Sequence, residues 1–211
     1  PVFADSVASR EREGELAREF LGQRNEFLLD DGSHLIRLAH DTEACPGVLD
    51  TLVGAAEETT SGLRPLRSFD LRIPVLASND ARSKTLFDNA YGTGQSCWTT
   101  ILDLIDPRGV GAPVAGMSVV VIGYGDVGRG CARFGAALGA RVTVVELDPV
   151  RALQASMDGF AVASLQEAAA SAGVLISATG ERSTIPLSAL EAAPGGAIVT
   201  VAGGVDGEVS I

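Results

Sequence analysis

The chain has 211 residues, of which 46% are hydrophobic and 20% charged, and its 27 acidic and 16 basic residues give a formal net charge of −11. This length is enough for one large domain or two small ones with a real core. The acidic balance argues against a surface for nucleic acid or an anionic membrane, because both partners would be repelled. No apolar run is as long as the stretch of about 18 residues that spans a bilayer. The given sequence also does not begin with the basic segment followed by an apolar segment that is typical of a signal peptide. We therefore expect a folded, acidic enzyme.

Cysteine and histidine are scarce in this sequence. The three cysteines, Cys45, Cys97 and Cys131, are odd in number and widely separated. This pattern indicates buried thiols in a reducing, cytoplasmic setting and no disulfide frame. The only histidines are His34 and His40, and no C-x-x-C pair is present, so we expect no metal site.

The first half of the chain predicts short elements of mixed type. Residues 9–20 (SREREGELAREF) have the pattern of an amphipathic helix with a solvated charged face. Strands are expected at residues 25–32, which run into an acidic turn, and at residues 71–78. Helices are expected at residues 50–58, where E-T-T-S-G breaks the helix, and again at residues 87–104.

A run of turn residues, DPRGVGAPVAG at residues 106–116, is typical of a linker. It places the expected domain boundary between a partial substrate region at residues 1–115 and a nucleotide-binding domain at residues 116–211.

The second half alternates strands with helices. Five β-branched runs predict strands: MSVVVIG, RVTVVE, FAVAS, GVLISAT and AIVTVAG. Helical segments lie between them, at residues 127–138, 149–157, 166–172 and 187–192. This alternation predicts an α/β fold with a right-handed, doubly wound parallel sheet of the Rossmann type. The last run, near residue 200, is expected at a sheet edge, which natural proteins usually pair or cover. We therefore expect a homo-oligomer.

A glycine-rich loop follows the first strand of that half. Gly123, Gly125 and Gly128 have the G-x-G-x-x-G spacing directly after a strand and before a helix. They would permit the tight turn, the close approach to a pyrophosphate and the packing of helix on strand. Such a triplet alone is also common in ordinary turns. Glu146, at the end of the next strand, makes the pattern more specific, because an acid there accepts hydrogen bonds from the adenosine ribose and disfavours a 2′-phosphate. The sequence therefore predicts NAD as the cofactor, with the nearby Arg151 read as a surface residue.

Ionisable side chains cluster at three places in the first half. Asp30 and Asp31 end an expected strand, E-E-T-T-S-G begins at residue 57, and Lys84 and Asp88 lie four residues apart, on one face if that turn is helical. Each cluster alone is equally compatible with a solvated turn or with a surface ion pair worth at most about 1 kcal/mol.

Several motifs together indicate a protein family. The segments LLDDG, EETTSG, LRIPVLASND, SKTLFDNAYGTGQS, VVVIGYGDVGRGCA and LGARVTVVELDPVRALQASMDGF occur in this order across residues 28–209. The chain therefore resembles S-adenosyl-L-homocysteine hydrolases (adenosylhomocysteinases). The resemblance implies that the 3′-hydroxyl of the substrate ribose is oxidised with a tightly held NAD. The C4′ proton becomes acidic, homocysteine is eliminated from C5′, water adds, and the ketone is reduced again.

The resemblance also implies roles for individual residues. Lys84 matches the group that deprotonates the 3′-hydroxyl, a task toward which desolvation and neighbouring groups can tune a lysine. Asp88 and Glu58 match residues that hold the ribose hydroxyls, and Asp31 matches the residue beside the C4′ and C5′ proton transfers. The expected contacts of NAD are Thr59, Thr60, Ser61, Asn89, Gly123, Gly125, Asp126, Val127, Gly128, Glu146, Thr179 and Gly180. Of these, Thr59, Thr60, Ser61 and Asn89 match the nicotinamide half, as do Thr179 and Gly180 after the fourth strand of the second half.

The chain departs from the family pattern at functional positions. The family has further residues before the D-D-G strand, including adenine contacts and a catalytic histidine, and it continues beyond residue 211. Gly204 stands where the family has a histidine, and Val201 stands where it has an asparagine. His34 replaces an acid, and Arg151 replaces an asparagine.

Three interpretations therefore stay open. The chain oxidises a secondary hydroxyl of a nucleoside or related sugar, it performs full hydrolysis of S-adenosylhomocysteine if it is a fragment, or it is a non-catalytic NAD-binding subunit. The presence of Asp31, Glu58, Lys84 and Asp88 together favours an enzyme with a nucleoside-like partner.

Overall fold

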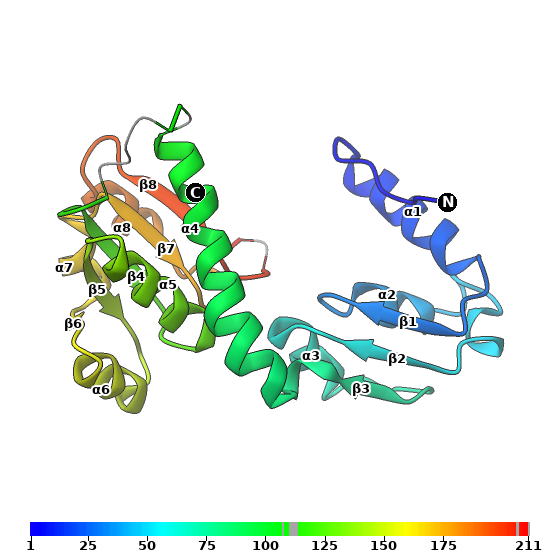
Figure 1. Ribbon diagram of the computed structural model, residues 1–211. Helices are drawn as coiled ribbons and strands as arrows, with labels where there is room; N and C mark the ends of the chain where they lie inside the picture. The colour runs from blue at the N-terminus through cyan, green and yellow to red at the C-terminus, as the bar shows by residue number, and fades with distance from the viewer. Residues whose placement is uncertain (107, 110–113, 206, 211) are drawn as a thin grey trace. The chain divides into compact units, whose positions relative to one another are not determined.

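The computed structural model describes residues 1–106, 108–109, 114–205 and 207–210, and the chain divides into two units, Pro1–Ala81 and Arg82–Ile211 (Figure 1). Each unit contains its own parallel sheet. Among the described residues, no helix combines the length and apolarity that crossing a membrane requires.

The first unit has a three-stranded parallel sheet in the order β1-β2-β3, formed by Phe27–Asp30, Gly54–Glu57 and Val75–Ala77. Its α-helices are α1 (Arg10–Leu21), α2 (His34–Ala39) and α3 (Thr60–Leu66), and short 3₁₀ turns form η1 (Val48–Asp50) and η2 (Ser78–Asp80). Helix α1 confirms the amphipathic prediction and is capped by the Ser9 hydroxyl, which accepts from the Arg12 N–H at 3.2 Å. Leu28, Ile36 and Ala55 belong to the core of this unit.

The helix expected at residues 50–58 is wrong. The chain instead forms the turn η1 and the central strand β2, which pairs with a strand on each side. Gly54, Ala55 and Glu57 are buried in β2, the pattern of a strand covered on both faces. The E-T-T-S-G run does not end a helix but begins α3, because the Thr59 hydroxyl caps it by accepting from the Gly62 N–H at 3.1 Å. Pairing with two neighbouring strands overrides the local helical preference of this segment.

The second unit is built on a five-stranded parallel sheet in the order β6-β5-β4-β7-β8. The strands are β4 (Ser118–Ile122), β5 (Arg141–Val145), β6 (Ala161–Val162), β7 (Val174–Ser177) and β8 (Ile198–Val201). The helices between them are α5 (Asp126–Ala137), α6 (Pro149–Met157), α7 (Leu165–Ala169) and α8 (Leu187–Ala192). All five expected strands and all four expected helices are confirmed, and β8 is an edge strand.

Both faces of this sheet are covered. Along β4, Val119 and Val121 belong to one buried cluster, whereas Val120 and Ile122 belong to another. Successive side chains of a strand point to opposite faces, so a central strand with a core on each side must be apolar at every position. This explains the continuous V-V-V-I run.

Two helical segments precede the sheet of the second unit. The helix expected at residues 87–104 is longer, because a π-helix, η3 (Lys84–Thr93), leads directly into α4 (Gly94–Ile105). Trp98 of α4 is 2% exposed and donates from Nε1 to the Cys131 carbonyl of α5 at 2.8 Å. The backbones also approach closely, since a Cβ on Gly94 would lie 2.7 Å from the carbonyl carbon of Gly130. Because of this packing, the helical segment of η3 and α4 belongs to the second unit.

The division between the units therefore falls before Arg82, earlier than the expected boundary after residue 115. The expected linker lies partly outside the described residues. The assignment of a substrate role to one part and a cofactor role to the other stays a prediction.

Candidate functional site

The glycine loop lies between β4 and α5 and has the backbone geometry that the motif predicts. Gly123 has φ +92°, a conformation that favours glycine. A Cβ on Gly128 would lie only 1.9 Å from the Gly123 carbonyl oxygen, so the first turn of α5 can close on the loop only without a side chain there. At this turn Asp126 pairs with Arg129 at 2.6 Å, and the partly buried Val127 packs on the core. The loop ends at a helix N-terminus, the arrangement that favours a phosphate.

Glu146 lies against this loop. Its Oε2 accepts from the Tyr124 N–H at 2.7 Å, and its Oε1 accepts from the N–H groups of Leu147 and Asp148 at 2.7 and 2.9 Å. Because β5 pairs with β4, the acid at the end of β5 reaches the loop after β4. The three backbone donors orient the carboxylate. Each oxygen has two lone pairs, so Oε1 is fully used and a further donor can still bind at Oε2.

Arg151 also lies near the loop, since its Nη1 would be 3.9 Å from a Cβ on Gly125. Its Nε is 4.0 Å from Asp148 Oδ2, and its side chain is 55% exposed. The expected surface position of Arg151 is therefore confirmed, although it stands beside the loop.

The end of β7 meets the same loop. A Cβ on Gly123 would lie 2.9 Å from Thr179 Cγ2, so Thr179 packs directly on the first glycine. Gly180, with φ +64°, continues the turn. The Thr179 hydroxyl lies 2.7 Å from Thr184 Oγ1 and 3.3 Å from Oε2 of Glu208.

Glu208 is a residue for which the sequence predicted no role. Its side chain is 1% exposed, and its Oε2 also accepts from the Ser177 hydroxyl. The sequence offered little signal, since Glu208 is one of two acids, with Asp206, in the otherwise small and apolar stretch VAGGVDGEVS.

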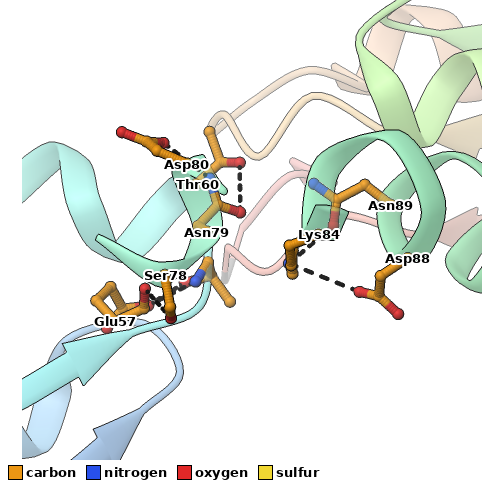
Figure 2. A network of polar contacts seen from close by, with 9 residues as sticks. Glu57, Thr60, Ser78, Asn79, Asp80, Lys84, Asp88 and Asn89 are labelled. Carbon is orange, nitrogen blue, oxygen red and sulfur yellow. Dashed lines mark hydrogen bonds and ion pairs between the residues drawn. The ribbon is translucent and has the colours of Figure 1, made fainter. Parts of the chain in front are cut away.

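Lys84, Asp88 and Asn89 come together on η3 (Figure 2). Lys84 Nζ donates to Asn89 Oδ1 at 2.8 Å and lies 3.7 Å from Asp88 Oδ2. The shared face of Lys84 and Asp88 is confirmed, and the π-helix, with its i to i+5 hydrogen bonds, also aligns Lys84 with Asn89. Asn89 is buried, whereas 23% of the Lys84 side chain is exposed. This arrangement holds an ammonium group next to one carboxylate and one amide at a partly open position.

Lys84 is also the only lysine in the sequence, because all other residues among the 16 lysines and arginines are arginines. Arginine stays protonated in proteins, whereas a lysine can lose its proton when its surroundings tune it. The one lysine of the chain therefore lies in a polar cluster with Asp88 and Asn89.

In the first unit, two buried acids organise the two acidic turns. Asp30 accepts from the Ile36 N–H at 2.8 Å and from the Asp31 N–H at 3.0 Å. Burial raises the pKa of the Asp30 carboxyl, against the effect of the Ile36 hydrogen bond. Glu57 is fully buried and accepts from the N–H groups of Gly32, Ser33 and Thr59 at 3.0, 2.8 and 2.9 Å. These buried acids leave their neighbours accessible.

The accessible neighbours of these buried acids are two of the predicted catalytic acids. Asp31 is exposed and Glu58 is half-buried. The Glu58 N–H donates to the Asp30 carbonyl at 3.1 Å, which holds the two turns side by side. The structure therefore brings the Asp31 and Glu58 segments together in one place of the first unit.

The hydroxyl residues after Glu58 mostly contact the protein itself. The Thr59 hydroxyl donates to Glu57 Oε1, and the Thr60 hydroxyl donates to Asn79 Oδ1 at 3.3 Å (Figure 2). The Ser78 hydroxyl in turn donates to the Glu57 carbonyl at 2.9 Å. Ser61 is half-buried in the first turn of α3. Within the described ranges, no group of three or more His, Cys, Asp or Glu side chains is placed to hold a metal ion.

A family model described as "S-adenosyl-L-homocysteine hydrolase, NAD binding domain" matches residues 89–211. The match includes the glycine loop, Glu146 and the Thr179–Gly180 turn, and begins at Asn89 of η3.

Curated relatives cover nearly the whole chain. An adenosylhomocysteinase of Pyrococcus abyssi is 42% identical over 212 residues, which are 99% of this chain and 49% of that protein. An S-inosyl-L-homocysteine hydrolase of Methanothermobacter thermautotrophicus is 45% identical over 169 residues, 78% of this chain and 39% of that protein. The chain thus spans about half the length of the curated relatives it matches.

Solved structures agree on the fold. A phosphoglycerate oxidoreductase of Vibrio cholerae superposes with a TM-score of 0.60 at 19% identity, covering 95% of this chain and 66% of the other. A dipicolinate synthase subunit from Bacillus halodurans reaches 0.54 at 21% identity, covering 69% of this chain and 49% of the other. At this level of identity the likeness shows a Rossmann-type α/β fold.

Proposed function

Because the chain belongs to the S-adenosyl-L-homocysteine hydrolase family and NAD is its cofactor, we propose that it oxidises a ribose 3′-type secondary hydroxyl of a nucleoside or related sugar. The observation that carries this proposal is the cluster of Lys84, the only lysine, with Asp88 and Asn89 on η3. A pure NAD-binding subunit has little use for a lysine held in this way.

The described residues fit NAD at the glycine loop. At the N-terminus of α5, the absence of side chains at Gly123, Gly125 and Gly128 makes the backbone N–H groups accessible to a phosphate. Glu146, which backbone N–H groups hold in place, would accept hydrogen bonds from the adenosine ribose hydroxyls. When bound, NAD accepts a hydride from the substrate carbon. We assign Asp126 and Val127 to the same end of the site.

The nicotinamide half is assigned to the polar residues that match the family at that end. These are Thr59, Thr60, Ser61, Asn89, Thr179 and Gly180. The Thr60 hydroxyl donates within the protein, so it can still accept a hydrogen bond from a ligand. The Thr59 hydroxyl donates to Glu57 and accepts from the Gly32 and Gly62 N–H groups, so its contribution would be to hold the turn in place.

The catalytic roles are those that the family resemblance implies, and the chemistry of each group is compatible with them. Lys84, in its neutral amine form, would take the proton of the reacting hydroxyl and become an ammonium group, since a base must be within hydrogen-bonding reach of the proton that it removes. Asp88 and Glu58 would accept hydrogen bonds from the ribose hydroxyls, and Asp31, being exposed, would serve the proton transfers at C4′ and C5′.

Two substitutions at Lys84 test this proposal. The full chain with NAD is mixed with adenosine or inosine, and the absorbance of NADH is followed. Lys84→Ala should abolish NADH formation and leave NAD bound, because it removes a transition-state interaction and no cofactor contact. Lys84→Arg should be similarly inactive, since it keeps the positive charge but cannot give up its proton. Arg82→Ala, at an exposed position two residues away, is the control.

Retained activity in Lys84→Arg would contradict the role of Lys84 as a base. Wild-type protein that binds NAD but forms no NADH with either nucleoside would favour a non-catalytic NAD-binding subunit instead.

Full hydrolysis of a nucleosyl-homocysteine is the second candidate, favoured by the names of the relatives, adenosylhomocysteinase and S-inosyl-L-homocysteine hydrolase. Gly204, which stands at a family histidine, cannot transfer a proton. We therefore expect this chain to release little homocysteine from S-adenosylhomocysteine. Rapid release would show that other groups replace the histidine.

The cofactor end has its own test. Glu146→Ala should weaken NAD binding by about 1–3 kcal/mol, the scale of a lost hydrogen bond to a charged group, measured by calorimetry. Equal binding of NADP and NAD by the wild type would contradict the role of Glu146 against a 2′-phosphate.

We also propose a homo-oligomer in a reducing, cytoplasmic setting. Strand β8 is an edge strand of the described sheet, and Cys45, Cys97 and Cys131 are free thiols. A monomer mass by light scattering at micromolar concentration would refute the oligomer.

A further inference from the structure

Glu208 is a buried acid to which the proposed reaction gives no role. It follows β8 in a segment that pairs with the chain before α8. The Ile185 N–H donates to the Glu208 carbonyl at 2.9 Å, and the Ser210 N–H donates to the Ile185 carbonyl at 2.9 Å. These bonds hold the backbone of Glu208, so its side chain has a defined position at the end of β7.

The carboxyl group of Glu208 is only half satisfied. Its Oε2 accepts from the hydroxyls of Ser177 and Thr179. Its Oε1 is buried and, within the described part of the chain, has no hydrogen-bond partner. Leaving a buried acceptor unpaired costs stability. An apolar residue would serve a purely structural purpose better, so the acid at this position calls for another explanation.

The Thr179 hydroxyl connects this acid to the glycine loop. Thr179 Oγ1 accepts from the Glu181 N–H at 3.1 Å and lies 2.7 Å from Thr184 Oγ1. The methyl group of the same residue packs on Gly123, where a Cβ would lie 2.9 Å away. Glu208 therefore contributes to fixing a side chain that touches the first glycine of the cofactor loop.

The chain also keeps space free for the carboxyl group. A Cβ on Gly203 would lie 1.9 Å from Oε1 of Glu208 and 2.8 Å from the Gly180 nitrogen. The φ of Gly203 is not positive, so its backbone conformation does not require glycine. The absence of a side chain at Gly203 instead makes room for Oε1 of Glu208 and the Gly180 nitrogen. Three segments, after β7, after β8 and around residue 208, thus meet at Thr179 and Gly180.

We propose that Glu208 is a positioning residue for the nicotinamide half of NAD, acting through Thr179 and the Gly180 turn. This rests on the proposed assignment of Thr179 and Gly180 to the nicotinamide. Oε1 is shielded from solvent, so Glu208 acts on the shape and hydrogen-bond direction of the turn and not by touching the cofactor. Glu146 and the glycine loop govern the adenosine and pyrophosphate half separately.

Two ligands that share one half of NAD test this division. The full chain is titrated with NAD and with ADP-ribose, which lacks the nicotinamide, by calorimetry. Glu208→Gln should weaken NAD binding about tenfold, the effect of one lost hydrogen bond to a charged group, and leave ADP-ribose binding unchanged. Glu191→Gln, an exposed acid on α8, should change neither affinity.

Thr179→Val provides a second variant in case Glu208→Gln does not fold. It keeps the packing on Gly123, removes the hydroxyl that contacts Glu208, and should show the same selective loss. An equal loss for both ligands, or no loss for NAD, in the folded variants would overturn the proposal. So would wild-type binding of NAD no tighter than that of ADP-ribose. Failure of the proposed oxidation would show differently, as absent NADH formation with the affinity for NAD intact.

Discussion

Replacing Glu57 with glutamine should destabilise the first unit more than its small chemical change suggests. Oε1 of Glu57 accepts from the Gly32 and Thr59 N–H groups and from the Thr59 hydroxyl, and Oε2 accepts from the Ser33 N–H at 2.8 Å. A glutamine keeps the shape but must place an NH₂ group at one of these oxygens. The better orientation puts it at Oε2, opposite the Ser33 N–H, where two donors face each other.

The expected cost follows from this geometry. An orphaned buried donor costs about 1–3 kcal/mol, and the remaining bonds weaken when their acceptor loses its charge. We expect a total of about 2–4 kcal/mol. With a slope of about 1–3 kcal/mol per molar urea for a small domain, the midpoint of the first unit should fall by about 1 M or more.

The assay is urea unfolding followed by amide hydrogen exchange in β1 and β2, which reports this unit separately. Glu26→Gln, an exposed acid just before β1, is the matched control and should leave the midpoint unchanged. A midpoint for Glu57→Gln equal to that of the wild type would refute the assignment of Glu57 as the acid that joins the two turns.

The remaining predictions concern pH, packing and thiol chemistry. Because burial raises the pKa of Asp30 in the folded protein, its contribution to stability is complete below the unfolded pKa and is lost as the pH rises through the folded pKa. The wild type should therefore lose stability relative to Asp30→Asn over this pH range, and a pH-independent difference in urea midpoint would contradict the sign. Gly135→Ala should cost about 1–3 kcal/mol, since a Cβ would lie 2.7 Å from Trp98 Cζ2. Fluorescence of this single tryptophan follows the unfolding, and an unchanged midpoint would show that the helices separate freely. A hydrogen bond with Cys131 lowers the pKa of Cys97 to about 7. The rate at which iodoacetamide modifies Cys97 should therefore rise around that pH, and modification should be slower in Cys131→Ala than in the wild type. Mass spectrometry of the labelled peptides gives the rates, and equal rates in both proteins would exclude the thiol pair as the cause.

Some of the organisation of this protein could be predicted from local pattern alone. In the second unit, β-branched runs of strand length alternate with helical segments, and each expected strand and helix forms. The spacing of the three loop glycines already predicted a close approach of helix and loop, and the structure has no room for a side chain at Gly128. The position of Glu146 beside the loop follows from the parallel pairing of β5 with β4. These features depend on residues close in sequence or on one rule of topology.

Other features depended on contacts between distant residues. The segment 54–57 is a strand because β1 and β3 pair with it on both sides, which its own sequence does not reveal. The helical run from Lys84 belongs to the second unit because Trp98 and Gly94 pack on α5.

By itself, therefore, the sequence determined the Rossmann sheet, the cofactor loop and the family, since short-range periodicity and glycine sterics are legible along the chain. Only the tertiary structure decided which acids are buried supports and which are accessible, for example Glu57 against Glu58 and Asp30 against Asp31. It alone revealed Glu208 at the end of β7. The physical reason is that burial and hydrogen-bond partners are properties of the folded neighbourhood, and adjacent residues of one type can lie in opposite environments.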